Sequence, residues 1–228
     1  MFRTAVYWIK QYQEKGALWI HDGNPKRPHA LLTSGKHSNG FFNSRLVIPD
    51  EKLMREAAQD LANSFIQNDH MMHEIDCVVG PQTGATKLAE LISHELSERR
   101  GRRCSWASPA KDGDGEDKRM VFDNPKQTVK PGENVLLCED VLTTGGSVEL
   151  TTSAVVSAGG NVLSAVVVLV NRSGIMDVGG KKIMALIDRT MPMWEPDKCP
   201  LCMIGSKAIR PKGTENWACL NAPYKEEM

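Results

Sequence analysis

Two adjacent carboxylates followed by a hydroxyl- and glycine-rich turn form the segment of this chain most able to do chemistry. Glu139 and Asp140 end the stretch VLLCED, and the turn TTGGS follows at 143–147. Neighbouring ionised carboxylates repel each other, so they favour a ligand that offers hydroxyl donors or a cation. The turn offers hydroxyls and backbone amides, and its glycines let the backbone approach a ligand closely. These groups together suit a sugar phosphate that is accompanied by Mg²⁺.

The elements around this window must hold the acids and the turn in place. The apolar run 135–138 predicts a short strand buried in a parallel sheet, and a helical pattern begins near Ser147. Ligands of parallel sheets bind beyond the carboxyl ends of the strands, which is where Glu139 and Asp140 are expected. The N-terminus of the following helix would add its positive dipole end to an anion site.

Strand and helix patterns alternate along most of the chain. Helices are predicted over 50–67, 85–100 and 147–157, and strands over 75–79, 104–107, 135–138, 161–170 and 182–187. This alternation predicts an α/β fold with a parallel sheet and helices on both faces. A further helix before Gly16 is expected to bury Phe2, Val6, Ile9 and Tyr12. The segment 108–121 is expected to be a polar loop, and 191–228 an appended tail.

Composition narrows the class of protein. The chain has 228 residues, of which 41% are hydrophobic, so a normal core can form. The formal net charge is zero, which argues against a nucleic-acid surface. Six scattered cysteines are typical of a reducing compartment, and neither a signal peptide nor a membrane-spanning stretch is evident. We therefore expect a cytoplasmic protein with no membrane partner.

The window 135–147 resembles the phosphoribosyl-pyrophosphate (PRPP) motif of the type I phosphoribosyltransferases. The resemblance implies their fold, a parallel sheet flanked by helices with a small N-terminal hood. The implied domain covers 1–190, with the hood at roughly 1–48 and the core at roughly 49–190. It also implies a substrate site that includes Glu139, Asp140, Thr143, Thr144, Gly145, Gly146 and Ser147.

Three further segments are similar to orotate phosphoribosyltransferases. The segment ALLTSGKHSNGFFNSRLV (30–47) matches the family's Leu-x-Ser-Gly-x-x-Ser pattern followed by two aromatic residues, here Phe41 and Phe42. The segment DCVVGPQTG resembles its pyrophosphate loop, formed here by Gly80, Pro81, Gln82, Thr83 and Gly84. Arg172 stands where the family places an arginine that holds the orotate carboxylate, although Asn171 replaces the usual aspartate.

The resemblance implies transfer of the phosphoribosyl group of PRPP to orotate, which gives orotidine 5′-monophosphate and pyrophosphate. In this scheme Mg²⁺ is bound mainly through PRPP, Phe41 and Phe42 wall the base site, and Lys111 and Asp140 are the catalytic candidates. The family also implies a homodimer. Two alternatives stay open: a phosphoribosyltransferase for another base, and a PRPP-binding regulator without catalysis.

The segment 111–119 departs from what a lid over pyrophosphate requires. Its three cations, Lys111, Lys118 and Arg119, are outnumbered by four carboxylates, which leaves a net charge of minus one. A lid of this kind is favourable only if its carboxylates face solvent or help to hold Mg²⁺. A mobile catalytic lid and a simple connector both fit the pattern.

Cys199 and Cys202 have the spacing of half a zinc site in the motif CPLC. Cys219 offers a distant third thiolate, and neither zinc nor a redox role is decided by this spacing alone. His37 lies beside the proposed base site and is expected to be a surface histidine.

Overall fold

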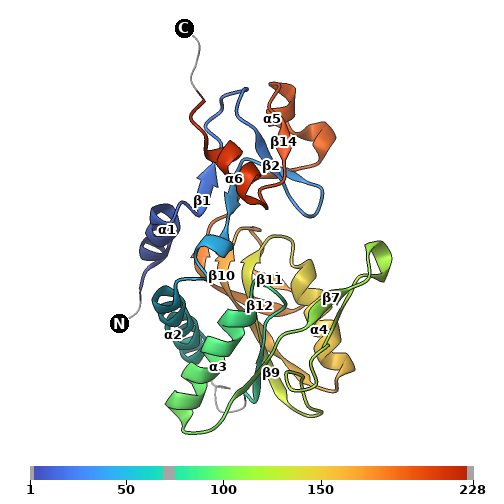
Figure 1. The fold of residues 1–228 in the computed structure, drawn as a ribbon. Helices are drawn as coiled ribbons and strands as arrows, with labels where there is room; N and C mark the ends of the chain where they lie inside the picture. The colour runs from blue at the N-terminus through green and yellow to red at the C-terminus, as the bar shows by residue number, and fades with distance from the viewer. Residues whose placement is uncertain (1–2, 69–74, 225–228) are drawn as a thin grey trace.

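A computed structural model describes residues 3–68 and 75–224 of the chain and contains a central six-stranded sheet (Figure 1). Its spatial order is β11-β12-β10-β9-β5-β6, and all neighbouring strands are parallel except β11 against β12. The strands are β5 (Cys77–Val79), β6 (Ser105–Ala107), β9 (Asn134–Leu142), β10 (Asn161–Asn171), β11 (Asp177–Val178) and β12 (Lys181–Asp188).

Helices cover both faces of this sheet. On one face, α2 (Glu51–Asn68) and α3 (Thr86–Arg100) pack on each other and on the strands, whereas α4 (Gly146–Ser157) packs on the other face (Figure 1). The apolar stripe expected on the second helix is buried, with Leu53, Ala57, Leu61 and Phe65 at most 4% exposed. The predicted α/β class with helices on both faces is confirmed.

The direction of strand addition reverses between β5 and β9. From β5 the chain first adds β6 on one side, then returns to place β9, β10 and β12 on the other side. Such a switch point separates the loops that follow two neighbouring parallel strands, which leaves a crevice at their carboxyl ends. Here the loops are 80–84 after β5 and 143–147 after β9, so the two predicted phosphate-binding segments lie next to each other.

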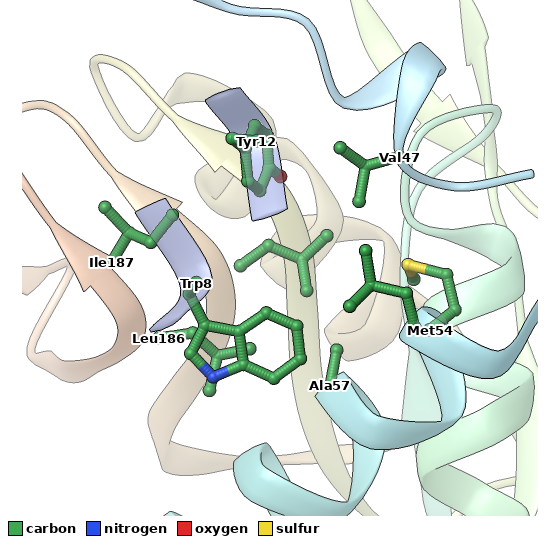
Figure 2. A pocket seen from close by; sticks show the side chains of 9 residues that line it. Trp8, Tyr12, Val47, Met54, Ala57, Leu186 and Ile187 are labelled. Atoms are coloured by element: carbon green, nitrogen blue, oxygen red, sulfur yellow. The ribbon is translucent and has the colours of Figure 1, made fainter. Parts of the chain in front are cut away.

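The first helix, α1 (Ala5–Glu14), buries Tyr12 and packs Ile9 on the core as expected, but it exposes Val6 and buries Trp8 instead. Trp8 and Tyr12 are 2% exposed, whereas Val6 is 75% exposed; Phe2 lies outside the described residues. Aromatic side chains bury more apolar area than a valine, and the indole Nε1 of Trp8 also donates to Asp60 Oδ2 at 3.2 Å. Figure 2 shows Trp8 and Tyr12 in a small pocket with Met54 and Ala57. Because this pocket is lined mainly by apolar side chains, it does not suit phosphate.

The N-terminal hood contains two small sheets. One pairs β1 (Leu18–Ile20) with β4 (Gly40–Phe42), followed by the 3-10 turn η1 (Ser44–Leu46). The other has the order β13-β3-β2-β14 and combines β2 (His29–Leu31) and β3 (His37–Ser38) with two strands from the C-terminal segment, β13 (Met193–Trp194) and β14 (Ala208–Ile209).

The C-terminal segment therefore contributes β13 and β14 to the hood sheet, although the division of the chain at 190 stays a prediction. Between β13 and β14 lie the turn η4 (Pro196–Lys198) and the short helix α5 (Pro200–Met203). The last helix, α6 (Thr214–Asn221), buries Leu220 against Trp19 of β1. The indole Nε1 of Trp19 donates to the carbonyl of Leu220 at 2.8 Å, which fixes this end of the chain on the hood.

The segment 108–121 is a hairpin, so its prediction as an irregular loop was wrong. β7 (Ala110–Asp112) pairs antiparallel with β8 (Arg119–Val121), and the 3-10 turn η3 (Gly115–Asp117) connects them. Met120 is 4% exposed, and this single buried anchor is too short a pattern to indicate strands in the sequence. In Figure 1 the hairpin projects from the body of the protein.

Within the described ranges, every helix is too short or too polar to cross a membrane.

Candidate functional site

The loop after β5 comes into close contact with the acidic end of β9. A β-carbon added at Gly84 would lie 2.7 Å from Oδ2 of Asp140, and one added at Gly80 would lie 2.7 Å from Sγ of Cys138. Any side chain at Gly84 would therefore displace this carboxylate, so glycine is required by the approach of the two strand ends. The loop 80–84 is also held by the segment after β6, because the amide of Gln82 donates to the carbonyl of Pro109 at 2.9 Å.

The turn after β9 presents unused hydrogen-bond donors. In the part of the chain that the structure describes, the amides of residues 143–147 and the hydroxyls of Thr143, Thr144 and Ser147 donate no hydrogen bond. Gly145 has a φ of 89°, and a β-carbon there would lie 2.5 Å from Val178. Gly145 is the left-handed N-cap of α4, and unused amides at a helix N-terminus suit an anionic ligand.

The strand β9 extends past its predicted end at Cys138 and includes both acids. Burial raises the pKa of Glu139 well above its ordinary value, and the charge of Asp140 raises it further. Asp140 is only partly buried and accepts from the amide of Val141 at 2.8 Å. A protonated Glu139 beside Asp140 relieves the repulsion between the two side chains when no cation or sugar is bound.

Cations from three distant segments act electrostatically on the two acids or on one another. The charge of Lys111 at the base of the hairpin acts on Glu139 and lowers its pKa, against the larger effect of burial. Partial burial and the charges of Lys111 and Arg45 lower the pKa of Lys212, whereas Asp140 raises it. Sequence analysis missed Arg45 and Lys212, because nothing in the sequence indicates that the C-terminal segment returns to this crevice.

Among the hairpin residues whose side chains the structure describes, the carboxylates are paired or exposed. Arg119 Nη2 lies 2.7 Å from Oδ2 of Asp112, and this ion pair is largely exposed. Asp114 and Asp117 at the hairpin tip are exposed to solvent. Of the three candidate cations, Lys111 is the one with an electrostatic effect on Glu139.

Arg172 lies at the end of β10 and joins the sheet to the hood. It is 1% exposed; its Nη1 donates to the carbonyl of Gly40 at 3.0 Å and its Nη2 to Oγ of Ser38 at 2.6 Å. Its Nε has no hydrogen-bond partner, and no ion pair found among the described residues includes it. Burial lowers the pKa of Arg172 to about 10. A buried cation without a carboxylate partner is costly, which favours an anionic ligand here.

The structure places Phe41 and Phe42 on opposite faces of β4. Phe42 is 2% exposed and packs edge-on against Tyr12, with 5.2 Å between the ring centroids. Phe41 instead packs against Trp217 of α6 at 5.9 Å. Successive side chains of a strand point to opposite faces, so the two rings do not form one wall.

The hood also brings together His29, His37, Cys199 and Cys202, the first three of which are buried. The prediction of His37 as a surface histidine was wrong, because β13 pairs with β3 and the C-terminal segment covers its ring. The sequence could not show this, since the cysteines lie more than 160 positions beyond both histidines.

Comparison with known proteins agrees with this geometry. Residues 48–197 match the family model described as the phosphoribosyl transferase domain. An orotate phosphoribosyltransferase of Desulforamulus reducens is 36% identical, over 80% of this chain and 87% of the relative. Another, from Acidithiobacillus ferrooxidans, is 34% identical over 91% of this chain and 96% of the relative.

Solved structures show the same fold with different named activities. Orotate phosphoribosyltransferase from Aeropyrum pernix matches with a TM-score of 0.54 and 22% identity, over 78% of this chain and 92% of that one. Adenine phosphoribosyltransferase from Rhodothermus marinus matches with a TM-score of 0.53 and 19% identity, over 80% and 99%. The fold alone therefore does not identify the accepting base.

Proposed function

The chain belongs to the phosphoribosyltransferase family, and from this premise we propose that it transfers the phosphoribosyl group of PRPP to orotate. The products are orotidine 5′-monophosphate and pyrophosphate, a step of pyrimidine nucleotide synthesis. Relatives that carry the name orotate phosphoribosyltransferase align over most of the chain at 34–36% identity, which supports this activity over others of the same fold.

The crevice between β5 and β9 would bind PRPP in three parts. The 5′-phosphate would bind the unused amides and hydroxyls of 143–147, and the pyrophosphate the backbone of 80–84. Glu139 and Asp140 would accept hydrogen bonds from the ribose hydroxyls. These segments follow adjacent strands, so the two anionic ends of PRPP would be fixed on either side of the reacting carbon.

The acidic pair also fits Mg²⁺, which prefers oxygen ligands and keeps several of its waters. The carboxylate of Asp140 faces the loop at Gly84, where the pyrophosphate would bind. Mg²⁺ held there mainly through PRPP, with Asp140 beside it, would neutralise charge on the leaving group. A cation near Glu139 would also favour its ionised form, against the effect of burial.

The environment of Arg172 is the observation that favours a nucleobase with a carboxylate group. Its buried guanidinium has an unpaired Nε and no acidic partner among the described residues, and it is bonded to the hood through Ser38 and Gly40. A carboxylate on the incoming base would supply the missing counter-charge. Neutral purines offer no such group, so this arrangement favours orotate.

In the transfer, the bond from ribose C1 to the pyrophosphate oxygen breaks and a bond from C1 to the base nitrogen forms. The pyrophosphate leaves with the electron pair, and the proton of the nitrogen passes to the released pyrophosphate or to solvent. Lys111 would stabilise the charge that develops on the leaving group. It lies in β7, and its charge already acts on Glu139. Lys212 and Arg45 would add to the same positive field.

We also infer a homodimer, on the family resemblance alone. A cytoplasmic location is inferred from the six free cysteines, which are typical of a reducing compartment.

A panel of bases tests the proposal. The purified chain would be incubated with PRPP and Mg²⁺ and with orotate, uracil, adenine, hypoxanthine or nicotinate in turn. We expect nucleotide formation with orotate at a kcat/KM at least tenfold above that with any other base. Turnover of a purine in preference to orotate would overturn the assignment of the base but retain that of PRPP.

A further inference from the structure

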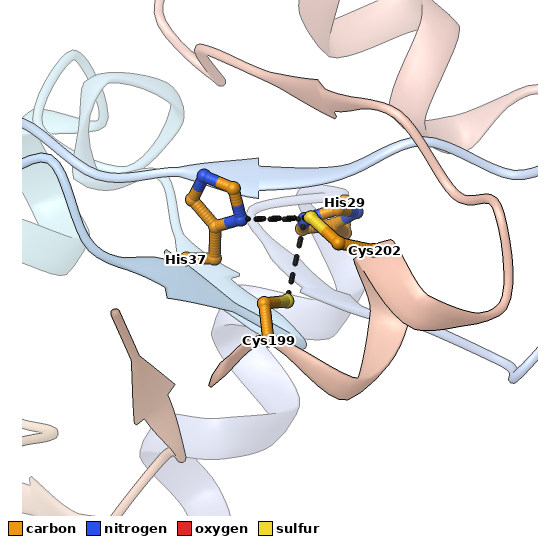
Figure 3. Close-up of side chains that lie close together, drawn as sticks. All are labelled: His29, His37, Cys199 and Cys202. Carbon is orange, nitrogen blue, oxygen red and sulfur yellow. Dashed lines mark hydrogen bonds between the residues drawn. The ribbon is translucent and has the colours of Figure 1, made fainter. Parts of the chain in front are cut away.

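The hood contains four side chains whose ligand atoms converge on one point, away from the crevice that would bind PRPP. His29 belongs to β2, His37 to β3, and Cys199 and Cys202 to the segment around α5 (Figure 3). Their ligand atoms all lie within 4.8 Å of one another. No other group of three or more such residues is found in the described part of the chain.

Three sulfur–nitrogen distances in this cluster match a tetrahedral metal site, whereas the two ring nitrogens lie slightly closer together than in such a site. Sγ of Cys199 and Sγ of Cys202 each lie 3.6 Å from Nε2 of His29, and Sγ of Cys202 lies 3.3 Å from Nδ1 of His37. Nε2 of His29 lies 3.0 Å from Nδ1 of His37. Bonds of roughly 2.0–2.3 Å to a tetrahedral Zn²⁺ separate its ligand atoms by about 3.3–3.8 Å.

The protonation of His29 is set by a neighbour outside the cluster. Oγ of Ser206 donates to the carbonyl of Arg27, so it accepts from Nδ1–H of His29 at 2.9 Å. This bond leaves Nε2 of His29 without a proton and directs its lone pair toward the thiols. Metal-binding histidines commonly use the second ring nitrogen in this way. The arrangement is therefore already suited to a metal.

We propose that His29, His37, Cys199 and Cys202 form a structural zinc site that joins the C-terminal segment to the hood. Two thiols would lose their protons to solvent as Zn²⁺ binds, so two thiolates and the divalent cation make a neutral centre. Neutrality matters because Cys199 and His29 are 0% exposed. All four positions are taken by protein atoms, which is typical of a structural rather than a catalytic site.

A redox pair is the main alternative for a CxxC motif, and the histidines argue against it. A disulfide between Cys199 and Cys202 needs no imidazole, yet two ring nitrogens point at the sulfurs.

The proposed zinc site lies next to a residue that binds Arg172. His37 precedes Ser38, whose Oγ accepts from Arg172 and donates to the carbonyl of Pro192 at 2.7 Å. A metal bound to β2, β3 and α5 would fix the strand that carries Ser38. The zinc site itself does not depend on the proposed activity.

Metal analysis tests the proposal on the full chain. Protein purified under reducing conditions, stripped with a chelator and returned to Zn²⁺ should retain one zinc per chain after dialysis. The double variant Cys199→Ser/Cys202→Ser should retain less than a tenth of that, whereas Cys219→Ser, at an exposed cysteine outside the cluster, should retain it fully. Wild-type protein that retains no zinc, or a double variant that retains as much as wild type, would overturn the proposal.

Cobalt gives an answer that does not depend on whether the variants fold. Wild-type protein loaded with Co²⁺ should show the intense visible bands of tetrahedral coordination together with a thiolate charge-transfer band. Weak octahedral bands, or no thiolate band, would contradict a site made of two cysteines and two histidines. Neither measurement uses PRPP or orotate, so its failure is distinct from failure of the proposed function.

Discussion

Arg172 connects the end of β10 to the hood with two of its guanidinium nitrogens, while its Nε has no partner. Replacing it by glutamine retains a donor for Ser38 but removes the positive charge. A hydrogen bond to a charged group contributes about 1.5–3 kcal/mol. We therefore expect Arg172→Gln to raise the KM for orotate roughly 10–100-fold and to change PRPP affinity less than threefold.

Initial rates over a range of orotate concentrations, with calorimetry for PRPP, would measure this effect. Arg103→Gln, at an exposed arginine near the end of α3, is the matched control and should behave as wild type. An unchanged orotate KM in Arg172→Gln would remove Arg172 from the base site.

Glu139 is expected to make the stability of the protein depend on pH, because burial and then the charge of Asp140 raise its pKa. A carboxyl group whose pKa is higher in the folded than in the unfolded state favours folding while it is protonated. That contribution is present below its unfolded pKa near 4.5 and is lost as pH rises through the folded pKa. Each unit of difference in pKa changes the free energy of unfolding by about 1.4 kcal/mol.

Urea unfolding at pH 5 and pH 8 without ligand checks this effect. Glu139→Gln should unfold at a higher urea concentration than wild type at pH 8, with a smaller difference at pH 5, and it should bind PRPP more weakly. Glu149→Gln on the exposed face of α4 should show no such dependence on pH. A difference for Glu139→Gln that is equal at both pH values would contradict a buried carboxyl group whose pKa is raised on folding.

The order of residues in the sequence was enough to predict that a strand leads through two carboxylates into a glycine turn and a helix, because these parts are contiguous. The binding of phosphate at this turn stays a prediction. Strand alternation already indicates that Phe41 and Phe42 point to opposite faces of β4, so the single wall could have been excluded from the sequence. The sequence could not show Lys212, Arg45 or the two histidines beside the CPLC motif, because those contacts depend on how distant segments pack.

Among the elements, the loop after β5 is expected to bind PRPP through its backbone and not through its side chains. A β-carbon at Gly84 would lie 2.7 Å from the Asp140 carboxylate. We expect Gly84→Ala to weaken PRPP binding at least tenfold, whereas Thr83→Ala, which removes an exposed side chain from the same loop, should weaken it less than threefold. Calorimetric titration with PRPP and Mg²⁺ compares them, and equal affinities for Gly84→Ala and wild type would contradict the close approach.

The hairpin β7–β8 supplies the next prediction. Lys111 acts on Glu139, whereas Lys118 lies near the exposed tip of the hairpin. Loss of a group that stabilises developing charge lowers kcat by about 10²–10³-fold in other enzymes. We expect Lys111→Ala to lower kcat at least tenfold and Lys118→Ala to lower it less than threefold. Steady-state kinetics at saturating substrates would show this, and a larger effect at Lys118 would assign the catalytic role to the tip.

The alternation of strand and helix in the core was predictable because each core element has a complete apolar stripe, as α2 has at Leu53, Ala57, Leu61 and Phe65. The face of α1 was not, because Trp8 competes with Val6 for burial and also finds a partner in Asp60. The hairpin was missed because three-residue strands with charged ends have too short a pattern.

In the whole molecule, the helix α6 near the end of the described residues packs on the N-terminal hood. Leu220 in α6 is 0% exposed and belongs to an apolar cluster with Trp19 and Ala30 of the hood. Replacing a buried leucine by alanine typically costs about 2–5 kcal/mol. We expect Leu220→Ala to lower the free energy of unfolding by at least 2 kcal/mol, and Met203→Ala, at 73% exposure, to change it by less than about 0.5 kcal/mol.

Chemical denaturation monitored by tryptophan fluorescence would measure both variants. Equal stabilities of Leu220→Ala and wild type would mean that the C-terminal segment does not contribute to the packing of the hood. The sequence shows no helix-to-strand alternation after residue 189, so this integration could be found only from the pairing of β13 and β14 with the N-terminal strands.

The most direct test of the whole account is to measure pyrophosphate and orotidine 5′-monophosphate together in one reaction of PRPP, Mg²⁺ and orotate. We expect the wild-type chain to form the two products in equal amounts and to release negligible pyrophosphate without a base. Asp140→Asn should slow the formation of both products at least a hundredfold. Tight binding of PRPP with neither product formed from orotate would contradict this account and identify the chain as a binding protein.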